Sequence, residues 1–424
     1  MTDKIYQTYL QILKEELVPA MGCTEPIAIA YAAALAKSVL IGDPISVRVA
    51  ASANIIKNVK SVVVPNTGGR RGIAAAAAAG IVAGDTTKEL QVLSSVCDEQ
   101  HAQIEAFLAN VPCEVTQSDQ PYLFDIQIEL ESKEHRAFAQ ISGHHTNVTE
   151  LSLDGKAIIK KEYTEKISET SERLLLNVKD IIEFADSVYL DDIAPILERQ
   201  VSYNTAIAEE GLTGKWGARV GATLLATYGD DVHNRAKAYA AAGSDARMNG
   251  CEMPVIINSG SGNQGMTASL PVIVYAKDMG ASKDLLYRAL TVSNLVTIHM
   301  KTDIGRLSAY CGATSAGCGA GAGICYLHGG KAYEISHTIV NAVAINSGMI
   351  CDGAKASCAA KIASAVEAGL LGWQMQRQHT QFYAGEGIIT KGVENTIHNV
   401  GRVARLGMAE TDKEIIRIMM DMPK

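Results

Sequence analysis

The stretch from residue 112 to residue 153, PCEVTQSDQPYLFDIQIELESKEHRAFAQISGHHTNVTELSL, decides the fold class of this chain. It contains three runs typical of strands: CEVTQS, LFDIQIEL, and HRAFAQISG continued by HTNVTEL. Turn-forming residues at 118–121 and 132–134 separate these runs, and residues 153–156, LDGK, predict a further hairpin turn. The pattern predicts a small, mostly antiparallel sheet.

Helical patterns precede this stretch. Residues 3–18 carry apolar side chains at helical spacing up to Pro19, and a second helix is expected from residue 27 to about 41. Residues 45–53 alternate like a strand, and residues 73–83 predict an Ala-rich helix. The N-terminal part is therefore expected to mix helices with the sheet.

The strand signal fades after the charged segment at residues 160–173, and long helical patterns broken by Gly or Asn follow to the end of the chain. We therefore expect an α+β fold with two domains. Residues 1–165 would form the mixed α+β domain, which carries the GCTEP and NTGG loops, and residues 166–424 a largely helical domain.

Composition excludes several classes of protein. Acidic residues outnumber basic ones 46 to 38, so the chain lacks the basic surplus that binding of nucleic acid requires. Residues 1–17 show no signal peptide, and the apolar stretches at 27–41 and 72–84 do not predict a membrane span. We expect a cytoplasmic protein without membrane contact. Aromatic residues make up only 5%, so the helices must pack closely through small and aliphatic side chains.

Five of the nine cysteines lie in the last third of the chain. Cys311, Cys318 and Cys325 follow one another at a spacing of seven, and Cys351 and Cys358 repeat that spacing. Cysteines so placed can simply fill space in Gly/Ala-rich helices. Zinc is disfavoured because no C-x2-C pair occurs, whereas an iron–sulfur cluster tolerates wider spacing.

Residues 258–265, NSGSGNQG, match the glycine spacing of a dinucleotide-binding loop, but the strand–helix–strand unit around it is incomplete. A Ser/Gly/Asn loop that opens a helix offers N–H and hydroxyl donors for a small carboxylate. The alternative is a helix cap with no ligand. The candidate binding residues in this loop are Ser259, Ser261, Gly262, Asn263 and Gln264.

Two further polar loops are candidates for substrate binding, PNTGG at 65–69 with Thr67 and Gly68, and residues 142–147. Adjacent histidines on a strand point to opposite faces, so at most one of the two in the second loop should line a site. A purely structural histidine is the alternative there. The candidates in this loop are His145, Thr146 and Asn147.

The connector Gly22–Pro26, GCTEP, precedes the second expected helix. Thr24 can cap that helix and Pro26 suits its first turn. Cys23 would then lie just before the helix N-terminus, where the backbone N–H groups favour a thiolate. Its neighbour Glu25 opposes ionisation of that thiol and is the rival candidate for a general base.

Seven motifs together resemble the L-cysteine desulfidase family, relatives of the iron–sulfur L-serine dehydratases. In chain order they are GCTEP (22–26), PNTGG (65–69), GHHTN (143–147), SDARMNG (244–250), NSGSGNQG (258–265), RLSAYCGATSAG (306–317) and SGMICDGAKASC (347–358). The resemblance runs essentially from end to end. The combination of GCTEP with Cys-x39-Cys-x6-Cys is specific, unlike any single motif.

The resemblance implies an oxygen-labile [4Fe–4S] cluster on Cys311, Cys351 and Cys358, within an iron–sulfur catalytic domain. It also implies that Cys23 is the catalytic base and that L-cysteine is converted to pyruvate, ammonia and sulfide without pyridoxal phosphate. Three thiolates leave one iron free to act as a Lewis acid on the substrate. We expect the three polar loops to converge on that iron and to bind a small amino acid.

Other functions stay open at this point. An L-serine dehydratase would use the same mechanism, and a redox or metal-binding protein would use the cysteines without catalysis. A pyridoxal-phosphate lyase is less favoured, because the nearest lysine to the Gly-rich loop is Lys277. The sequence leaves the oligomeric state open, including a homo-oligomer.

Overall fold

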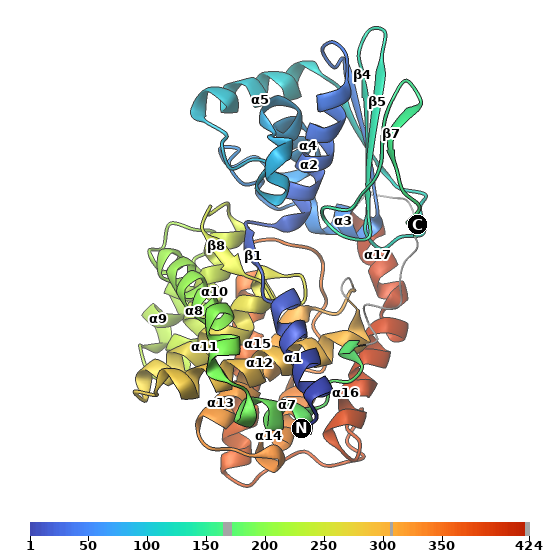
Figure 1. Ribbon diagram of the computed structural model, residues 1–424. Coiled ribbons are helices and arrows are strands. Elements are labelled where there is room, and N and C mark those ends of the chain that lie inside the picture. Colours follow the sequence, from blue (N-terminus) through green and yellow to red (C-terminus); the bar gives the residue numbers. More distant parts are fainter. Residues whose placement is uncertain (164–171, 306–307, 420–424) are drawn as a thin grey trace.

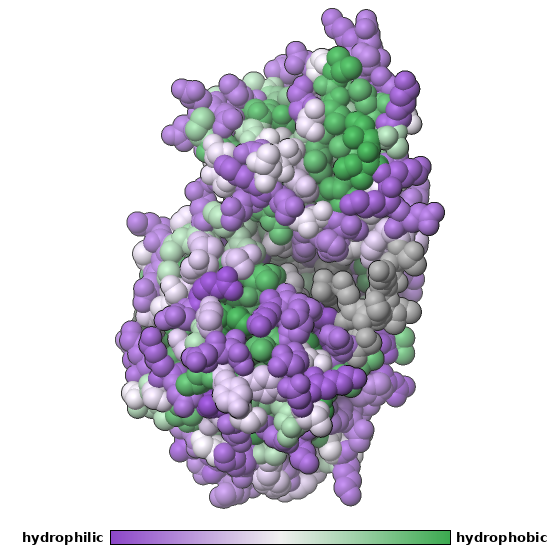
Figure 2. All heavy atoms as spheres, in the orientation of Figure 1, coloured by the Kyte–Doolittle hydropathy of each residue, from purple (hydrophilic) through white to green (hydrophobic). Residues whose placement is uncertain are grey.

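The computed structural model describes residues 1–163, 172–305 and 308–419, which form two lobes (Figure 1). The upper lobe contains the sheet with its covering helices, and the lower lobe is helical. Hydrophilic side chains cover most of the face shown in Figure 2. Within the described residues no helix combines the length and apolarity needed to cross a membrane. The α+β class is confirmed.

The upper lobe is built on a six-stranded sheet in which only β2 and β3 run parallel. This confirms the mostly antiparallel sheet expected from residues 112–153. In spatial order the strands are β3 (Cys113–Gln117), β2 (Ser46–Ala51), β4 (Asp125–Glu131), β5 (Arg136–Ser142), β6 (Val148–Leu153) and β7 (Lys156–Lys160).

Helices cover one face of this sheet (Figure 1). Along β4 the side chains of Ile126, Ile128 and Leu130 are fully buried beneath α2 (Thr24–Val39), which packs in turn on α4 (Gly72–Ala83). A Cβ atom on Gly80 of α4 would overlap the carbonyl of Ala30 in α2, so the two Ala-rich helices need a glycine at their contact. This lobe also contains α3 (Ala53–Val59), η1 (Thr86–Gln91) and α5 (Asp98–Asn110).

The lower lobe encloses a second hydrophobic core. Its helices are α1 (Asp3–Glu16), α7 (Val178–Ser187), α8 (Leu190–Leu212), α9 (Val220–Tyr228), α10 (Val232–Met248), α11 (Gly262–Asp278), α12 (Lys283–Ile304), α13 (Gly312–Leu327), α14 (Ala332–Ile345), α15 (Cys358–Arg377) and α16 (Val393–Arg402), with a π-turn η2 (Val403–Gly407) before α17 (Ala409–Met419). A Cβ on Gly317 of α13 would overlap the Ala365 carbonyl of α15. The close packing through small residues expected from the composition is thus present.

The chain crosses between the lobes near its N-terminus. Leu10 and Leu13 of α1 belong to the core of the lower lobe, so α1 packs with the helices rather than with the sheet. The strand β1 (Pro19–Met21) then pairs antiparallel with β8 (Pro254–Ile256) before α2 begins. Because the GCTEP motif follows β1 directly, it lies where the two lobes meet.

Candidate functional site

The structure brings Cys311 and Cys351 side by side. Tyr310 and Ile350 form an isolated antiparallel bridge, in which the Cys311 N–H donates to the Met349 carbonyl at 2.8 Å. The Cys351 N–H donates in turn to the carbonyl of residue 309 at 2.6 Å. The sequence pattern of the cysteines did not indicate this bridge between the two loops.

The third predicted ligand lies close by, at the start of a helix. Cys358 is the first residue of α15, and its Sγ lies 3.7 Å from the Gly353 carbonyl oxygen. The charge of Cys351 contributes to the raised pKa of the Cys358 thiol. Cys311 is the N-cap residue of α13. Two helix N-termini therefore contribute to this three-thiol site, which we define as Cys311, Cys351 and Cys358, and helix N-termini stabilise anionic ligands.

The three thiols differ in acidity. A hydrogen bond donated by the Cys311 thiol lowers the pKa of Cys351 to about 5, assisted by the charges of Lys57 and Lys301 and by the Gly353 N–H. The same hydrogen bond, together with burial, raises the pKa of Cys311 well above its ordinary value. Burial likewise raises the pKa of Cys358. Binding of a cation to all three sulfurs would therefore release protons.

The donor set consists of thiols, the ligands that iron–sulfur clusters use. Among the described residues no three His, Cys, Asp or Glu side chains converge as one metal ion would require. A [4Fe–4S] cube takes one thiolate per iron from separated positions, and three cysteines on two helix starts and one loop match that demand. The buried ammonium groups of Lys57 and Lys301 would offset part of the negative charge of such a cluster.

The other two cysteines of the period-seven stripe have a different environment. Cys318 and Cys325 point into the core of the lower lobe from the middle of α13. Burial raises the pKa of Cys318 to about 12 and that of Cys325 to about 11, so both remain protonated thiols. They behave as the small apolar residues considered in the sequence analysis.

Cys23 and Glu25 form a hydrogen-bonded pair at the start of α2. The Cys23 thiol and the Thr24 hydroxyl each donate to Glu25 Oε2 at 3.1 Å, and Asn58 Nδ2 donates to Oε1 at 3.1 Å. Cys23 itself is the N-cap residue and Thr24 is the first helical residue, so the expectation that Thr24 caps this helix was wrong. The cap position of Cys23 has no side-chain hydrogen bond to the helix backbone.

The acidities of this pair reverse the expected order. Burial, followed by the charge of Glu25, raises the pKa of the Cys23 thiol well above its ordinary value. The thiolate expected from the helix N-terminus is therefore not favoured. Burial also pushes the pKa of Glu25 upward, but the charge of His145 and the hydrogen bond from Cys23 outweigh it and leave the pKa lowered. Glu25 is the ionised member of the pair.

The Ser/Gly/Asn loop connects this pair to the three-thiol site. A Cβ atom on Gly312 would overlap the Gln264 side chain, so Gln264 lies against the residue that follows Cys311. On the other side Arg247 Nη1 donates to Asn263 Oδ1 at 3.3 Å, and the Arg247 charge lowers the pKa of Glu25. In the described part of the chain, Gln264 Oε1 and Arg247 Nε are buried without hydrogen-bond partners. Such atoms can bind a polar ligand or an ordered water.

Buried hydrogen bonds fix the conformation of the Ser/Gly/Asn loop. Ser259 takes a left-handed conformation with φ 50°, and α11 begins at Gly262 after its N-cap Ser261. The Ser259 hydroxyl donates to Asn258 Oδ1 at 2.9 Å, and Asn258 Nδ2 donates to Asn294 Oδ1 at 3.0 Å. These fully hydrogen-bonded amides fix the loop in place.

The other two polar loops use most of their hydrogen bonds within their own turns. The buried Thr67 hydroxyl donates to the Val64 carbonyl at 2.7 Å, and Gly68 faces Arg70 and His101. This loop nevertheless reaches the GCTEP motif, because a Cβ on Gly22 would overlap Pro65.

In the loop after β5, Asn147 Nδ2 donates to the Ser142 carbonyl at 2.9 Å, and the Thr146 carbonyl accepts from Val148 N–H. Both histidines lie in this turn and not in the strand, so the argument from alternation did not apply. His144 is exposed, whereas half-buried His145 packs on Phe124 and acts on Glu25.

Sequence reasoning missed Arg247, Lys57, Asn58 and Lys301. Arg247 lies within the SDARMNG motif, which carried the resemblance but received no role. Lys57 and Asn58 interrupt the apolar run of residues 54–64, NIIKNVKSVVV, and a polar pair in such a run is the signal that could have indicated them.

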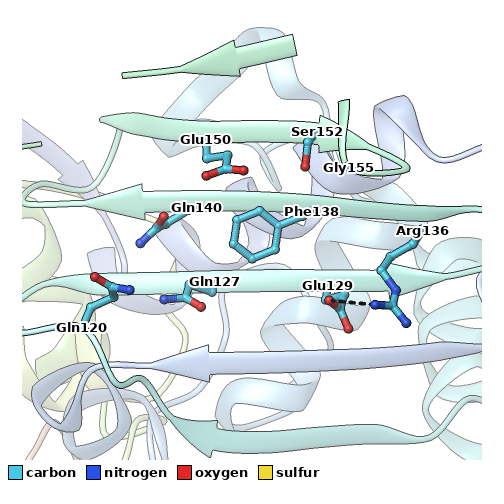
Figure 3. Close-up of a pocket in the computed structure, with 9 residues that line it drawn as sticks. All are labelled: Gln120, Gln127, Glu129, Arg136, Phe138, Gln140, Glu150, Ser152 and Gly155. Atoms are coloured by element: carbon cyan, nitrogen blue, oxygen red, sulfur yellow. Dashed lines mark ion pairs between the residues drawn. The ribbon is translucent and has the colours of Figure 1, made fainter. Parts of the chain in front are cut away.

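A separate hollow of about 390 Å³ lies on the open face of the sheet (Figure 3). It is lined by Gln120, Gln127, Glu129, Arg136, Phe138, Gln140, Glu150, Ser152 and Gly155. Within the lining, Arg136 pairs with Glu129 at 3.9 Å, and Arg136 also pairs with Glu131 outside it at 2.5 Å (Figure 3). Because it lies on the open face of the sheet and its lining contains no cysteine, we interpret it as part of the solvated sheet surface.

Comparisons with known proteins show the family of this chain. A family model described as "Serine dehydratase alpha chain" matches residues 87–417. A UPF0597 protein of Desulfitobacterium hafniense is 57% identical over 420 residues, which cover 99% of this chain and 98% of the relative. A UPF0597 protein of Lachnoclostridium phytofermentans is 48% identical, with 98% and 100% covered, and one of Finegoldia magna is 47% identical, again with 98% and 100% covered.

Proposed function

Because the chain belongs to the serine dehydratase alpha chain family, we propose that it is a lyase that eliminates the β-substituent of a small L-amino acid without pyridoxal phosphate. L-Cysteine is the preferred substrate, with pyruvate, ammonia and sulfide as products. The observation that carries the proposal is the series of neighbours that links the three-thiol site and Glu25: Gln264 lies against Gly312 beside Cys311, Asn263 accepts a hydrogen bond from Arg247, and the charge of Arg247 lowers the pKa of Glu25.

Cys311, Cys351 and Cys358 would hold a [4Fe–4S] cluster. When bound, that cluster supplies an iron without a protein ligand, a Lewis acid for the substrate carboxylate and the leaving group. Glu25 is placed to accept the Cα proton, since its carboxylate is ionised and already oriented by Thr24 and Asn58.

The proton balance of the reaction follows from this assignment. The Cα–H electron pair forms the Cα–Cβ double bond, the Cβ–S bond breaks, and its pair leaves with sulfur as hydrosulfide. Glu25 holds the proton meanwhile, and the Cys23 thiol that donates to it keeps the carboxylate in place. The released aminoacrylate tautomerises and is hydrolysed to pyruvate and ammonia.

Recognition of the substrate falls to the Ser259–Gln264 loop and Arg247. The guanidinium of Arg247 suits the α-carboxylate, and the unpartnered Gln264 Oε1 suits the α-ammonium group. Because the loop is braced from behind by buried amides, these groups keep their positions before substrate arrives. On the side of the sheet, His145 acts on Glu25 through its charge, and the loop of Thr67 reaches the GCTEP motif through Pro65.

L-Serine is the second candidate substrate, and the description of the matching family favours it. Hydroxide is the poorer leaving group, so the same site would turn serine over more slowly. A redox or metal-binding protein without catalysis stays the alternative from another class, but it gives no reason for the unpartnered Arg247 and Gln264 atoms.

The test is product analysis on the full-length protein, purified and reconstituted with iron and sulfide under anaerobic conditions. Incubation with L-cysteine should release pyruvate, ammonia and sulfide in equal amounts, and hydroxylamine, which traps pyridoxal phosphate, should not inhibit. The Cys351→Ser variant is the matched control and should be inactive. A loaded wild-type protein that forms pyruvate from neither L-cysteine nor L-serine would overturn the proposal.

A further inference from the structure

Lys57 is a charged residue in a place where charges are rarely found. Its side chain is only 1% exposed, and its neighbours on α3, Ile55 and Ile56, are buried in the core of the upper lobe. Burial of an ammonium group is unfavourable unless partners compensate for the lost water. The partners of Lys57 therefore indicate why it is there.

Those partners come from segments far apart in the chain. Lys57 Nζ contacts Asp412 Oδ1 of α17 at 2.5 Å and donates to the Ser308 carbonyl at 3.3 Å. A Cβ atom on Gly353, which has φ 92°, would overlap the Lys57 carbonyl, so the backbone of Lys57 lies against the loop after Cys351. Lys57 thus contacts both loops that carry the adjacent thiols. It contacts Ser308, three residues before Cys311, and Gly353, two residues after Cys351.

We propose that Lys57 is a positioning residue of the three-thiol site, which aligns the loops of Cys311 and Cys351 and places a fixed positive charge beside them. The inference deepens the proposed function and rests on it. Asp412 holds the ammonium group from the other side. Figure 1 shows α3 and α17 next to each other where the lobes meet, and the two helices are in contact.

Electrostatic reasoning separates this role from a purely structural one. The ammonium group acts on Cys351 through its charge, whereas Asp412 is the partner with the larger exposure, 19% of its side chain. A positive charge near a cluster favours its reduced, more negative state. Loss of Lys57 should therefore lower the reduction potential, and loss of the Asp412 charge should raise it. If the Lys57–Asp412 ion pair only held α3 and α17 together, the two substitutions would not shift the reduction potential in opposite directions.

The experiment uses the full-length protein reconstituted anaerobically, as wild type and as Lys57→Met, Asp412→Asn and Lys57→Arg. Lys413→Met is the matched control, because Lys413 lies on α17 next to Asp412 and forms an exposed ion pair with Glu410. The readouts are the midpoint potential of the cluster and the rate of iron loss to a ferrous chelator. Partners just outside a metal site typically change metal affinity by about 10-fold to 100-fold.

We expect Lys57→Met to lose iron about 10-fold faster than wild type and to have a lower potential. Asp412→Asn should have a higher potential, while Lys57→Arg and Lys413→Met should stay near wild type. If Lys57→Met and Asp412→Asn shift the potential in the same direction, or not at all, the inference is wrong. If Lys57→Met does not fold, the sign for Asp412→Asn decides. A wild-type chain that takes up no iron would instead overturn the proposed function.

Discussion

Replacing Glu25 with Gln removes the charge of the carboxylate while keeping the volume of the side chain. In the wild-type structure Glu25 accepts hydrogen bonds from Cys23, Thr24 and Asn58 at 3.1 Å each. The amide retains one acceptor oxygen for Asn58, and its NH₂ group can donate to the hydroxyl of Thr24. Since a hydrogen bond to a charged group contributes about 1.5–3 kcal/mol net and the bond from Cys23 is the one lost, the folded state should be destabilised by about 2–3 kcal/mol.

The effect on catalysis should be much larger. Removal of a general base lowers the rate by about 100-fold to 10,000-fold, which corresponds to about 3–5 kcal/mol of activation free energy. The Cys23→Ala variant keeps the carboxylate and should lose far less, because burial and the charge of Glu25 raise the pKa of the Cys23 thiol and keep it protonated.

The assay measures kcat/KM for L-cysteine under anaerobic conditions, with iron content and thermal unfolding recorded on the same samples. Solvent deuterium exchange at Cα of a slow substrate analogue reports proton removal directly. Normal exchange in Glu25→Gln with none in Cys23→Ala would refute the assignment and return the role to Cys23. Normal exchange in both variants would place the base elsewhere.

Three further predictions follow from the packing. Burial raises the pKa of Asp245 to about 6, so the free energy of unfolding should fall by about 3 kcal/mol as the pH rises from about 4 to about 6. In urea titrations the Asp245→Asn variant should lose this pH dependence of the unfolding free energy. The same pH dependence in the variant as in wild type would contradict the prediction. Gly312→Ala should push Gln264 aside and lower kcat/KM while iron content stays normal; loss of iron instead would mean that the glycine supports the cluster. Gly317→Ala should lower the free energy of unfolding by about 1–3 kcal/mol, because the new methyl group meets the rigid Ala365 carbonyl, and an unchanged denaturation midpoint would contradict the close helix contact.

Local patterns were sufficient for the sheet. In residues 125–131, DIQIELE, alternation places Ile126, Ile128 and Leu130 on the buried face, and this information is contained in the strand itself. By contrast α5 was missed, because Ile104 is its one fully buried residue and its exposed sides show little periodicity. The short α3 was also missed, since a seven-residue helix can hardly be distinguished from an apolar strand.

The sequence indicated candidate residues for the site but not how they are arranged. The proximity of Cys311 to Cys351 depends on the bridge between Tyr310 and Ile350, and no local pattern encodes a pairing across 40 residues. For the acidity of Cys23 the sequence indicated two opposing influences, the helix terminus and Glu25, but not the burial that raises its pKa most in the folded chain. Effects of tertiary packing on charge cannot be deduced from neighbours in sequence.

The central claim is that three cysteines, and not the period-seven stripe, hold an iron–sulfur cluster. The most direct measurement is the iron and sulfide content of anaerobically reconstituted wild type and of five single Cys→Ser variants. Wild type should bind about four irons per chain. Substitution of Cys311, Cys351 or Cys358 should remove most of the iron, and substitution of Cys318 or Cys325 should leave it in place. Loss of iron from Cys318→Ser or Cys325→Ser, with iron retained by Cys351→Ser, would contradict the account.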